Sequence, residues 1–171
     1  EQTVIRTEVS TIDTEYGEFT VHTYADSISD TTHLAFTKGE FTVDDAVLVR
    51  VHIPNTLRDV CDVLSKSRRS WSFGGALEKI ANEGKGVAVL LSSEDFNADY
   101  RQDIVSTRAR ERLPEESSHQ RSDLTIGTGS QILRDLGVGK MRLLSYPSKY
   151  NAISGFDLEV VEFVPFKRQE K

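Results

Sequence analysis

The side chains best suited to binding a phosphate group lie in the last third of the sequence. Lys149 follows Pro147 and Ser148, where its ammonium group either holds a phosphate as a point charge or stays solvated. Residues 127–129, Gly-Thr-Gly, precede a predicted helix, where backbone N–H groups can bind an anion. These glycines lack the full dinucleotide-binding fingerprint and fit helix packing better. Phosphate-binding chemistry is therefore only weakly indicated.

Metal-binding and nucleophilic side chains are few. Four histidines, His22, His33, His52 and His119, are too scattered along the chain to predict a metal site from their spacing. The single cysteine, Cys61, is most simply a small buried apolar residue rather than a reactive thiol. We therefore predict no metal site and no catalytic nucleophile.

The elements that must position these residues begin with strands. Two-residue alternation predicts strands over residues 16–24 and 32–37, and the apolar residues 46–52 predict a strand buried on both faces. Helical spacing follows from Trp71, with Gly84 placed where a helix ends in a left-handed residue. The front third is thus predicted to be β-rich and antiparallel.

Helices and buried strands alternate in the remainder. Residues 86–91, 140–144 and 158–164 predict strands, and residues 130–136 predict a short amphipathic helix closed by Gly137. This alternation predicts a partly parallel sheet with helical crossovers. The expected fold class is α/β of the mixed α+β kind.

Three segments carry weaker signals. Residues 1–14 are polar and aperiodic and are interpreted as a linker, residues 114–122 as a mobile loop, and residues 167–171 as a charged tail. Between them, residues 15–166 are expected to form one domain. A helix is expected near Tyr100. The arginines that follow could form a basic patch, but nearby glutamates offset their charge and favour a solvated helix face. The arginines are Arg108, Arg110 and Arg112, and the glutamates are Glu111, Glu115 and Glu116.

Composition bounds the function classes. The 171 residues carry a formal net charge of −6, which argues against binding to nucleic acid through a broad basic face. No apolar run approaches the roughly 20 residues of a membrane helix, and one cysteine provides no disulfide framework. We expect a cytoplasmic protein without a membrane partner. Because the only methionine is Met141, we interpret the chain as part of a longer protein.

Five segments, in order and near the expected spacing, resemble the GTP cyclohydrolase II family of riboflavin biosynthesis. They are residues 15–19, 47–52, 76–87, 131–138 and 158–165. Each is weak alone, but together they span most of the chain. The resemblance implies the scaffold of that family.

The zinc site of that family is not matched. Its first zinc-binding cysteine corresponds to about Asn55, and its closely spaced pair falls within residues 65–69, which contain no zinc ligand. We therefore expect the zinc cofactor to be lost. A zinc-bound water ionises near pH 7, whereas bulk water has a pKa of about 15.7, so forming hydroxide without the metal costs about 12 kcal/mol.

Other catalytic positions also depart from the family. Its Glu-Gly-Arg segment is replaced by residues 92–95, and its aspartate and nucleophilic arginine fall on about Ser122 and Leu124. A shift of one residue puts Asp123 in the aspartate position but supplies no arginine. Its phosphate-contacting turn corresponds to residues 145–149, which keep only a hydroxyl and the lysine. No catalytic residue is therefore assigned.

Three residues match family positions near the nucleotide and are the candidates for residual binding. They are Arg50, His52 and Lys149, although Arg50 and His52 also fit ordinary residues at the end of a buried strand. The resemblance implies a catalytically degenerate domain fused behind 3,4-dihydroxy-2-butanone 4-phosphate synthase. Such a domain would act in scaffolding, dimerisation or regulation, with a homodimer and the N-terminal synthase domain as partners.

Two alternatives remain open. In the first, the domain is a residual or rewired GTP-hydrolysing enzyme, which is a cyclohydrolase or a pyrophosphohydrolase. In the second, it senses a nucleotide without turning it over. Trp71 and Phe73 lie where the family has its metal site, and we hypothesise that they fill that volume with apolar side chains.

Overall fold

The computed structural model describes residues 2–64, 70–92, 100–108, 119–147 and 157–167. Its centre is one seven-stranded sheet with the strand order β1-β2-β3-β5-β4-β6-β7. The strands are β1 (Val4–Thr14), β2 (Gly17–Asp26), β3 (Thr31–Lys38), β4 (Ala46–His52), β5 (Gly86–Leu90), β6 (Lys140–Leu143) and β7 (Glu159–Phe163). The mixed α+β class predicted from the sequence is confirmed.

The pairing of neighbouring strands changes from antiparallel to parallel in the middle of the sheet. Strands β1, β2, β3 and β5 pair antiparallel. Strand β4 pairs parallel with both β5 and β6, and β6 pairs parallel with β7. Parallel neighbours need a crossover connection, and helices lie between β4 and β5 and between β5 and β6 along the chain. The predicted antiparallel front is confirmed for β2 and β3. It is wrong for β4, which was predicted as part of that front and pairs in parallel with β5 and β6. The predicted partly parallel remainder is present.

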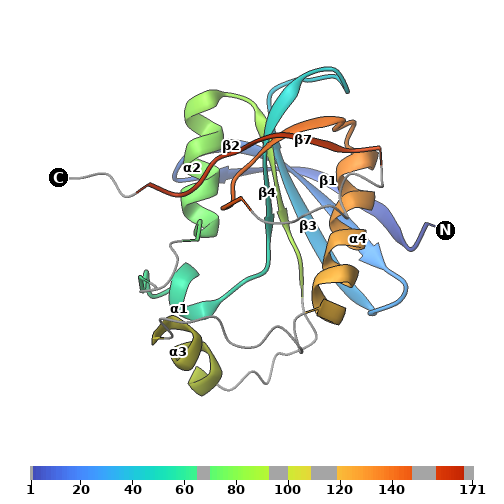
Figure 1. Ribbon diagram of the computed structural model, residues 1–171. Coiled ribbons are helices and arrows are strands. Elements are labelled where there is room, and N and C mark those ends of the chain that lie inside the picture. Colours follow the sequence, from blue (N-terminus) through green and yellow to red (C-terminus); the bar gives the residue numbers. More distant parts are fainter. Residues whose placement is uncertain (1, 65–69, 93–99, 109–118, 148–156, 168–171) are drawn as a thin grey trace.

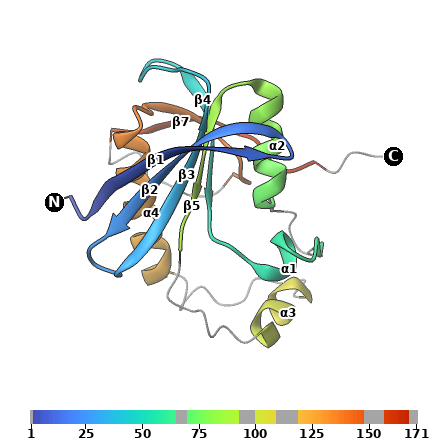
Figure 2. The same ribbon diagram turned by 180° about the vertical axis from the view of Figure 1, so that it is seen from behind.

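Helices cover both faces of the sheet, as Figures 1 and 2 show. The helices are α1 (Thr56–Asp59), α2 (Phe73–Glu83), α3 (Tyr100–Arg108) and α4 (His119–Asp135). Helix α2 lies on one face and α4 on the other, so the sheet separates two hydrophobic clusters. We call these faces the α2 face and the α4 face.

The two faces follow from the two-residue period of the strands. In β4, Leu48 packs in the cluster with α2, whereas Val47 and Val49 pack in the cluster with α4. All three are almost fully buried, with 2% exposure or less. Successive side chains of a strand point to opposite faces, so Arg50 and His52 follow Leu48 onto the α2 face.

Helix α2 begins and ends where its local sequence predicts. The Ser72 hydroxyl accepts a hydrogen bond from the Gly75 backbone N–H at 3.0 Å, which caps the N-terminus. Gly84 ends the helix with a left-handed backbone, at a φ of 82°. Between these caps, Ala76, Leu77 and Ile80 are buried against the sheet.

The interpretation of residues 1–14 as an irregular linker is wrong for Val4–Thr14, which form strand β1. This strand pairs with β2 along its length, with a register shift between Arg6 and Glu8. It is the edge of the sheet, and most of its side chains are exposed. An edge strand exposed on both faces lacks the apolar alternation that marks a half-buried strand.

The prediction of a loop over residues 114–122 is wrong for residues 119–122, which belong to α4. Residues 114–118 lie outside the described residues. Helix α4 is therefore longer than predicted. The tail predicted at 167–171 also lies outside the described residues, apart from residue 167. No helix in the described parts of the chain is both long and apolar enough to cross a membrane.

Candidate functional site

Arg50 and His52 meet at the carboxyl end of β4, on the α2 face. The Nε of Arg50 donates a hydrogen bond to Nδ1 of His52 at 3.0 Å. The two residues are two apart in a strand and therefore share a face. His52 is fully buried, so its ring has no access to solvent in the described structure.

These contacts fix the tautomer of His52. An arginine has no acceptor, so Nδ1 must be the unprotonated nitrogen of a neutral ring. Nε2 then carries the proton and donates to Oδ2 of Asp59 at 2.9 Å. His52 is thus held from both sides, and neither ring nitrogen is left for a ligand.

The short helix α1 brings Asp59 to His52. Asn55 caps this helix, because its side chain accepts a hydrogen bond from the Arg58 backbone N–H at 3.0 Å. The Asn55 backbone N–H donates to Asp59 Oδ2 at 2.8 Å, and that of Phe73 donates to Oδ1 at 2.9 Å. The carboxylate therefore ties together the end of β4, α1 and the start of α2.

Arg58 adds a positive charge beside this pair. Its Nη2 lies 3.2 Å from Asp59 Oδ2 and donates to the Ile53 carbonyl oxygen at 2.7 Å. The same nitrogen is 3.2 Å from His52 Nε2. Arg50 also donates to the carbonyl oxygens of Leu144 and Trp71, at 2.9 and 3.1 Å. We call Arg50, His52, Arg58 and Asp59 the polar cluster.

The polar cluster shifts the titration of its members. Burial lowers the pKa of His52, and the charges of Arg50 and Arg58 lower it further, against the raising effect of Asp59. Burial by itself would raise the pKa of Asp59. Hydrogen bonds from His52, Arg58 and the backbone outweigh burial and hold that pKa well below its usual range. At neutral pH the cluster thus has two guanidinium charges, one carboxylate and a neutral imidazole.

Aromatic side chains close the cluster on its α2 side. The Phe73 ring lies 5.3 Å from the ring of His52, between centroids. Trp71 is 8% exposed, and its Nε1 donates to the Val164 carbonyl oxygen at 2.7 Å. Its ring also packs edge-on against Phe166. These contacts support the hypothesis that apolar side chains fill this region.

The described residues do not fit a zinc ion at this place. The Asn55 side chain caps α1, and both ring nitrogens of His52 are hydrogen-bonded within the protein. The positive charge of the Arg58 guanidinium would repel a cation. No group of three or more potential metal ligands occurs among the residues that the structure describes. Residues 65–69 lie outside them, so the loss of zinc stays a prediction.

A small cavity lies next to Arg50. Its volume is about 90 Å³, and it is lined by residues of β4, α4 and the end of β6, including Val51, Ile126 and Leu133. Small-molecule sites usually enclose about 300–1,000 Å³. Within the described residues, this cavity is therefore too small and too apolar to hold a nucleotide.

The structure unites only part of the predicted nucleotide site. Arg50 and His52 are in contact, whereas Lys149 lies outside the described residues. Sequence reasoning missed Arg58 and Asp59. The available signal was a capping residue, Asn55, followed three and four residues later by this charged pair, directly after a strand ending in histidine.

Other sequence predictions have mixed outcomes. The prediction that Cys61 is buried is wrong. Cys61 follows the end of α1, and its side chain is exposed.

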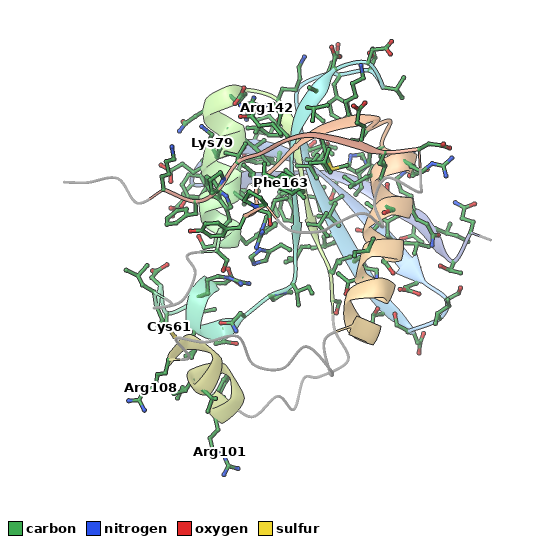
Figure 3. All side chains as sticks on the ribbon, viewed as in Figure 1. Cys61, Lys79, Arg101, Arg108, Arg142 and Phe163 are labelled. Carbon is green, nitrogen blue, oxygen red and sulfur yellow. The ribbon has the colours of Figure 1, made fainter. Side chains whose placement is uncertain are left out.

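Gly127 and Gly129 lie inside α4, so their backbone is not a free helix N-terminus. A Cβ at Gly129 would meet Val51 at 3.1 Å, which favours the helix-packing interpretation. Of the predicted arginine-rich face, only Arg108 is described, and Figure 3 shows it pointing outward.

Comparison with known proteins agrees with the resemblance. A sequence model described as GTP cyclohydrolase II matches residues 5–165, so the chain belongs to the GTP cyclohydrolase II family. A protein named 3,4-dihydroxy-2-butanone 4-phosphate synthase from Pseudomonas aeruginosa is 43% identical over 96% of this chain and 44% of its own length. The riboflavin biosynthesis protein RibBA of Aquifex aeolicus is 37% identical over 90% of this chain and 40% of its own.

A solved structure shares the fold. It is RibBX, a two-domain 3,4-dihydroxy-2-butanone 4-phosphate synthase from A. baumannii, with a TM-score of 0.67 and 36% identity. The similarity covers 98% of this chain and 41% of that one. The chain thus spans less than half the length of these relatives.

Proposed function

We propose that this domain does not catalyse the GTP cyclohydrolase II reaction and serves as a scaffolding, dimerisation or regulatory module of a riboflavin biosynthesis protein. The observation that carries this proposal is the closed polar cluster. Every polar atom of the His52 and Asp59 side chains has a partner inside the protein. The resemblance assigns one of the family's zinc-binding positions to nearby Asn55. A metal ion or a substrate would have to displace these hydrogen bonds in order to bind His52 or Asp59.

The relatives support the second half of the proposal. Several proteins that match this chain are named for the 3,4-dihydroxy-2-butanone 4-phosphate synthase reaction rather than for GTP hydrolysis. The matching region is less than half of each. The synthase chemistry then belongs to the other part of such a protein, and this domain supports it.

Exposed apolar side chains support an interaction role. Ile5, Val9 and Ile12 of the edge strand β1 are 57%, 54% and 48% exposed. A second group lies on and after α1 and on α3, which lie next to each other in Figures 1 and 2. Its members are Val60, Val63, Leu64, Tyr100, Ile104 and Val105. Exposed apolar side chains on neighbouring elements, as on α1 and α3, are available for contacts with another protein.

Incubation of the 171-residue chain with GTP and Mg²⁺, following formate and pyrophosphate separately, tests the first half. We expect neither product above a protein-free control. Formate release would restore the cyclohydrolase alternative and overturn the proposal; pyrophosphate alone would overturn it in favour of a pyrophosphohydrolase. Calorimetric titration with GTP tests the sensor alternative, and heat of binding at millimolar GTP would support it.

A second experiment tests the module role. In the longer protein, we expect deletion of this domain to change the oligomeric state, the synthase turnover or both, measured by analytical ultracentrifugation and product formation. The same protein carrying His52→Gln, whose amide can keep both hydrogen bonds of the ring, serves as a comparison that leaves the domain in place. Unchanged assembly and unchanged turnover on deletion would contradict the proposal.

A further inference from the structure

A second buried His–Asp pair lies on the α4 face, across the sheet from the polar cluster. His33 of β3 and Asp26 of β2 are 3% and 8% exposed. Nε2 of His33 lies 2.9 Å from Asp26 Oδ2, and Nδ1 accepts a hydrogen bond from the Ser92 backbone N–H at 2.9 Å. As with His52, these contacts select the neutral tautomer with the proton on Nε2.

Backbone groups also hold this second pair in place. Asp26 Oδ1 accepts hydrogen bonds from the backbone N–H groups of Ile28 and Ser29, at 3.0 and 3.3 Å. His33 is anchored at the carboxyl end of β5 through Ser92. The pair therefore forms a rigid wall between the β2–β3 turn and the end of β5.

This pair borders a cavity of about 300 Å³, which is larger than the cavity of about 90 Å³ next to Arg50. The remaining walls include Thr3, which directly precedes β1, and residues of α4 such as Thr128 and Gln131. This volume reaches the lower end of the range of small-molecule sites. The cavity lies at the carboxyl end of the parallel strand β5, where ligands bind in open α/β sheets.

The charges of the side chains that line the cavity indicate which class of ligand it can bind. Among the described residues that line the cavity there is no lysine or arginine, and Asp26 is the single acidic one. A phosphate group would face this carboxylate with no compensating cation, which disfavours nucleotides. Asp26 already accepts three hydrogen bonds, so it is not an open site for a cation.

The rest of the polar lining is made of hydroxyl and amide groups. Thr3, Ser29, Ser92, Thr125, Thr128 and Gln131 supply them. A hydroxyl has one donor and two acceptor positions, so it can bind a ligand hydroxyl in addition to a partner within the protein. This pattern matches a neutral ligand that carries several hydroxyl groups.

We propose that this cavity is a binding site for a small neutral polyhydroxy compound, a sugar or a polyol. The inference goes beyond the proposed function and does not depend on it. Ligand binding here also bears on β1, because the Gln131 side chain accepts hydrogen bonds from the Thr3 and Val4 backbone N–H groups at 2.9 and 3.2 Å. A ligand against Gln131 and Thr3 would hold the edge strand to α4.

Gly127 provides a test variant that remains folded. It lines the cavity, and a Cβ added there meets no atom within 4 Å. Leucine at this position of α4 occupies the open space and also raises helix propensity by about 1 kcal/mol. Gly127→Ala gains most of the same propensity with little added volume, so it is the matched control.

The experiment uses the 171-residue chain and saturation-transfer NMR with glycerol, erythritol, D-ribose, xylitol and D-glucose, beside inorganic phosphate and GTP. We expect at least one neutral compound to bind with millimolar affinity, with binding weakened about tenfold or more in Gly127→Leu and less than about threefold in Gly127→Ala. Melting temperatures of the variants verify that both are folded. Amide hydrogen exchange of β1 should slow when the compound is bound.

Three outcomes overturn the inference. They are no binding by any of the neutral compounds at tens of millimolar, tighter binding of phosphate or GTP than of the neutral compounds in this cavity, and full retention of binding in a folded Gly127→Leu variant. Absence of binding by the neutral compounds, or full retention of binding in Gly127→Leu, involves neither GTP nor zinc and therefore leaves the proposed function untouched. Binding of GTP in this cavity would overturn the inference and would also support the nucleotide-sensor alternative.

Discussion

His52 and Asp59 are joined by a hydrogen bond of 2.9 Å from the ring Nε2–H to the carboxylate, with His52 fully buried. Arg50 donates to the opposite ring nitrogen, so the imidazole has a single neutral tautomer. The bond links the end of β4 to helix α1, seven residues further along the chain.

Truncation of His52 should be costly. His52→Ala leaves a cavity and removes partners from both Arg50 and Asp59, so we expect the free energy of unfolding to fall by about 3 kcal/mol. His52→Gln should cost less, because an amide can both accept from Arg50 and donate to Asp59. Urea unfolding near neutral pH measures the difference. Equal losses in the two variants would contradict the tautomer derived above.

Acidification should destabilise the protein through His52. Its pKa is lowered in the folded state, so as the pH falls through the usual value of about 6.5 the unfolded chain takes up a proton before the folded chain does. The free energy of unfolding therefore decreases between about pH 7.5 and pH 5.5. The decrease should be smaller in His52→Gln. Some slope should remain, because burial and Arg6 also lower the pKa of His22. A steeper slope in the variant would be inconsistent with this account.

Replacement of Asp59 by asparagine tests the saturation of its carboxylate. The oxygens accept from His52, Arg58 and two backbone N–H groups. An amide NH₂ would face donors, so we expect a loss of about 2–3 kcal/mol in the free energy of unfolding. Asp62→Asn is the control, since Asp62 is exposed and has a φ of 55°, which asparagine tolerates; its effect should stay within about 0.5 kcal/mol. Similar effects of the two substitutions would argue against a buried network.

The two glycines of α4 should respond differently to alanine. Gly127→Ala meets open space and should stabilise the protein by about 0.5–1 kcal/mol. Gly129→Ala brings a Cβ to 3.1 Å from Val51, so the gain in helix propensity is offset by overpacking, and we expect a net loss of about 1 kcal/mol. Thermal unfolding of both variants checks the order. A stabilised Gly129→Ala would show that α4 packs less closely on β4.

The sequence predicted elements with a buried face and missed those without one. Helix α2 was recognisable because Leu77 and Ile80 share a face and Gly84 ends it. Strand β1 was not, because the register shift between Arg6 and Glu8 and its exposure at the sheet edge remove the alternation of apolar residues. The first turns of α4 lack a strong apolar stripe, and Gly127 and Gly129 have low helix propensity.

The candidate site was half predictable. Arg50 and His52 were predicted from the family resemblance. Arg58 and Asp59 do not, because a charged pair in a polar segment is ordinarily solvated, and only the tertiary contact with His52 makes it part of a site. The pair of His33 with Asp26 was equally hidden, since it depends on the pairing of β2 with β3.

Zinc content tests the central claim most directly. The chain is purified with zinc supplied throughout, freed of loosely bound metal by dialysis and analysed for metal by mass spectrometry. Because Arg58 and the hydrogen-bonded His52 and Asp59 exclude a cation from this place, we expect far less than one zinc per chain, unchanged in His52→Gln. About one zinc per chain in the wild type, lost in that variant, would contradict the account.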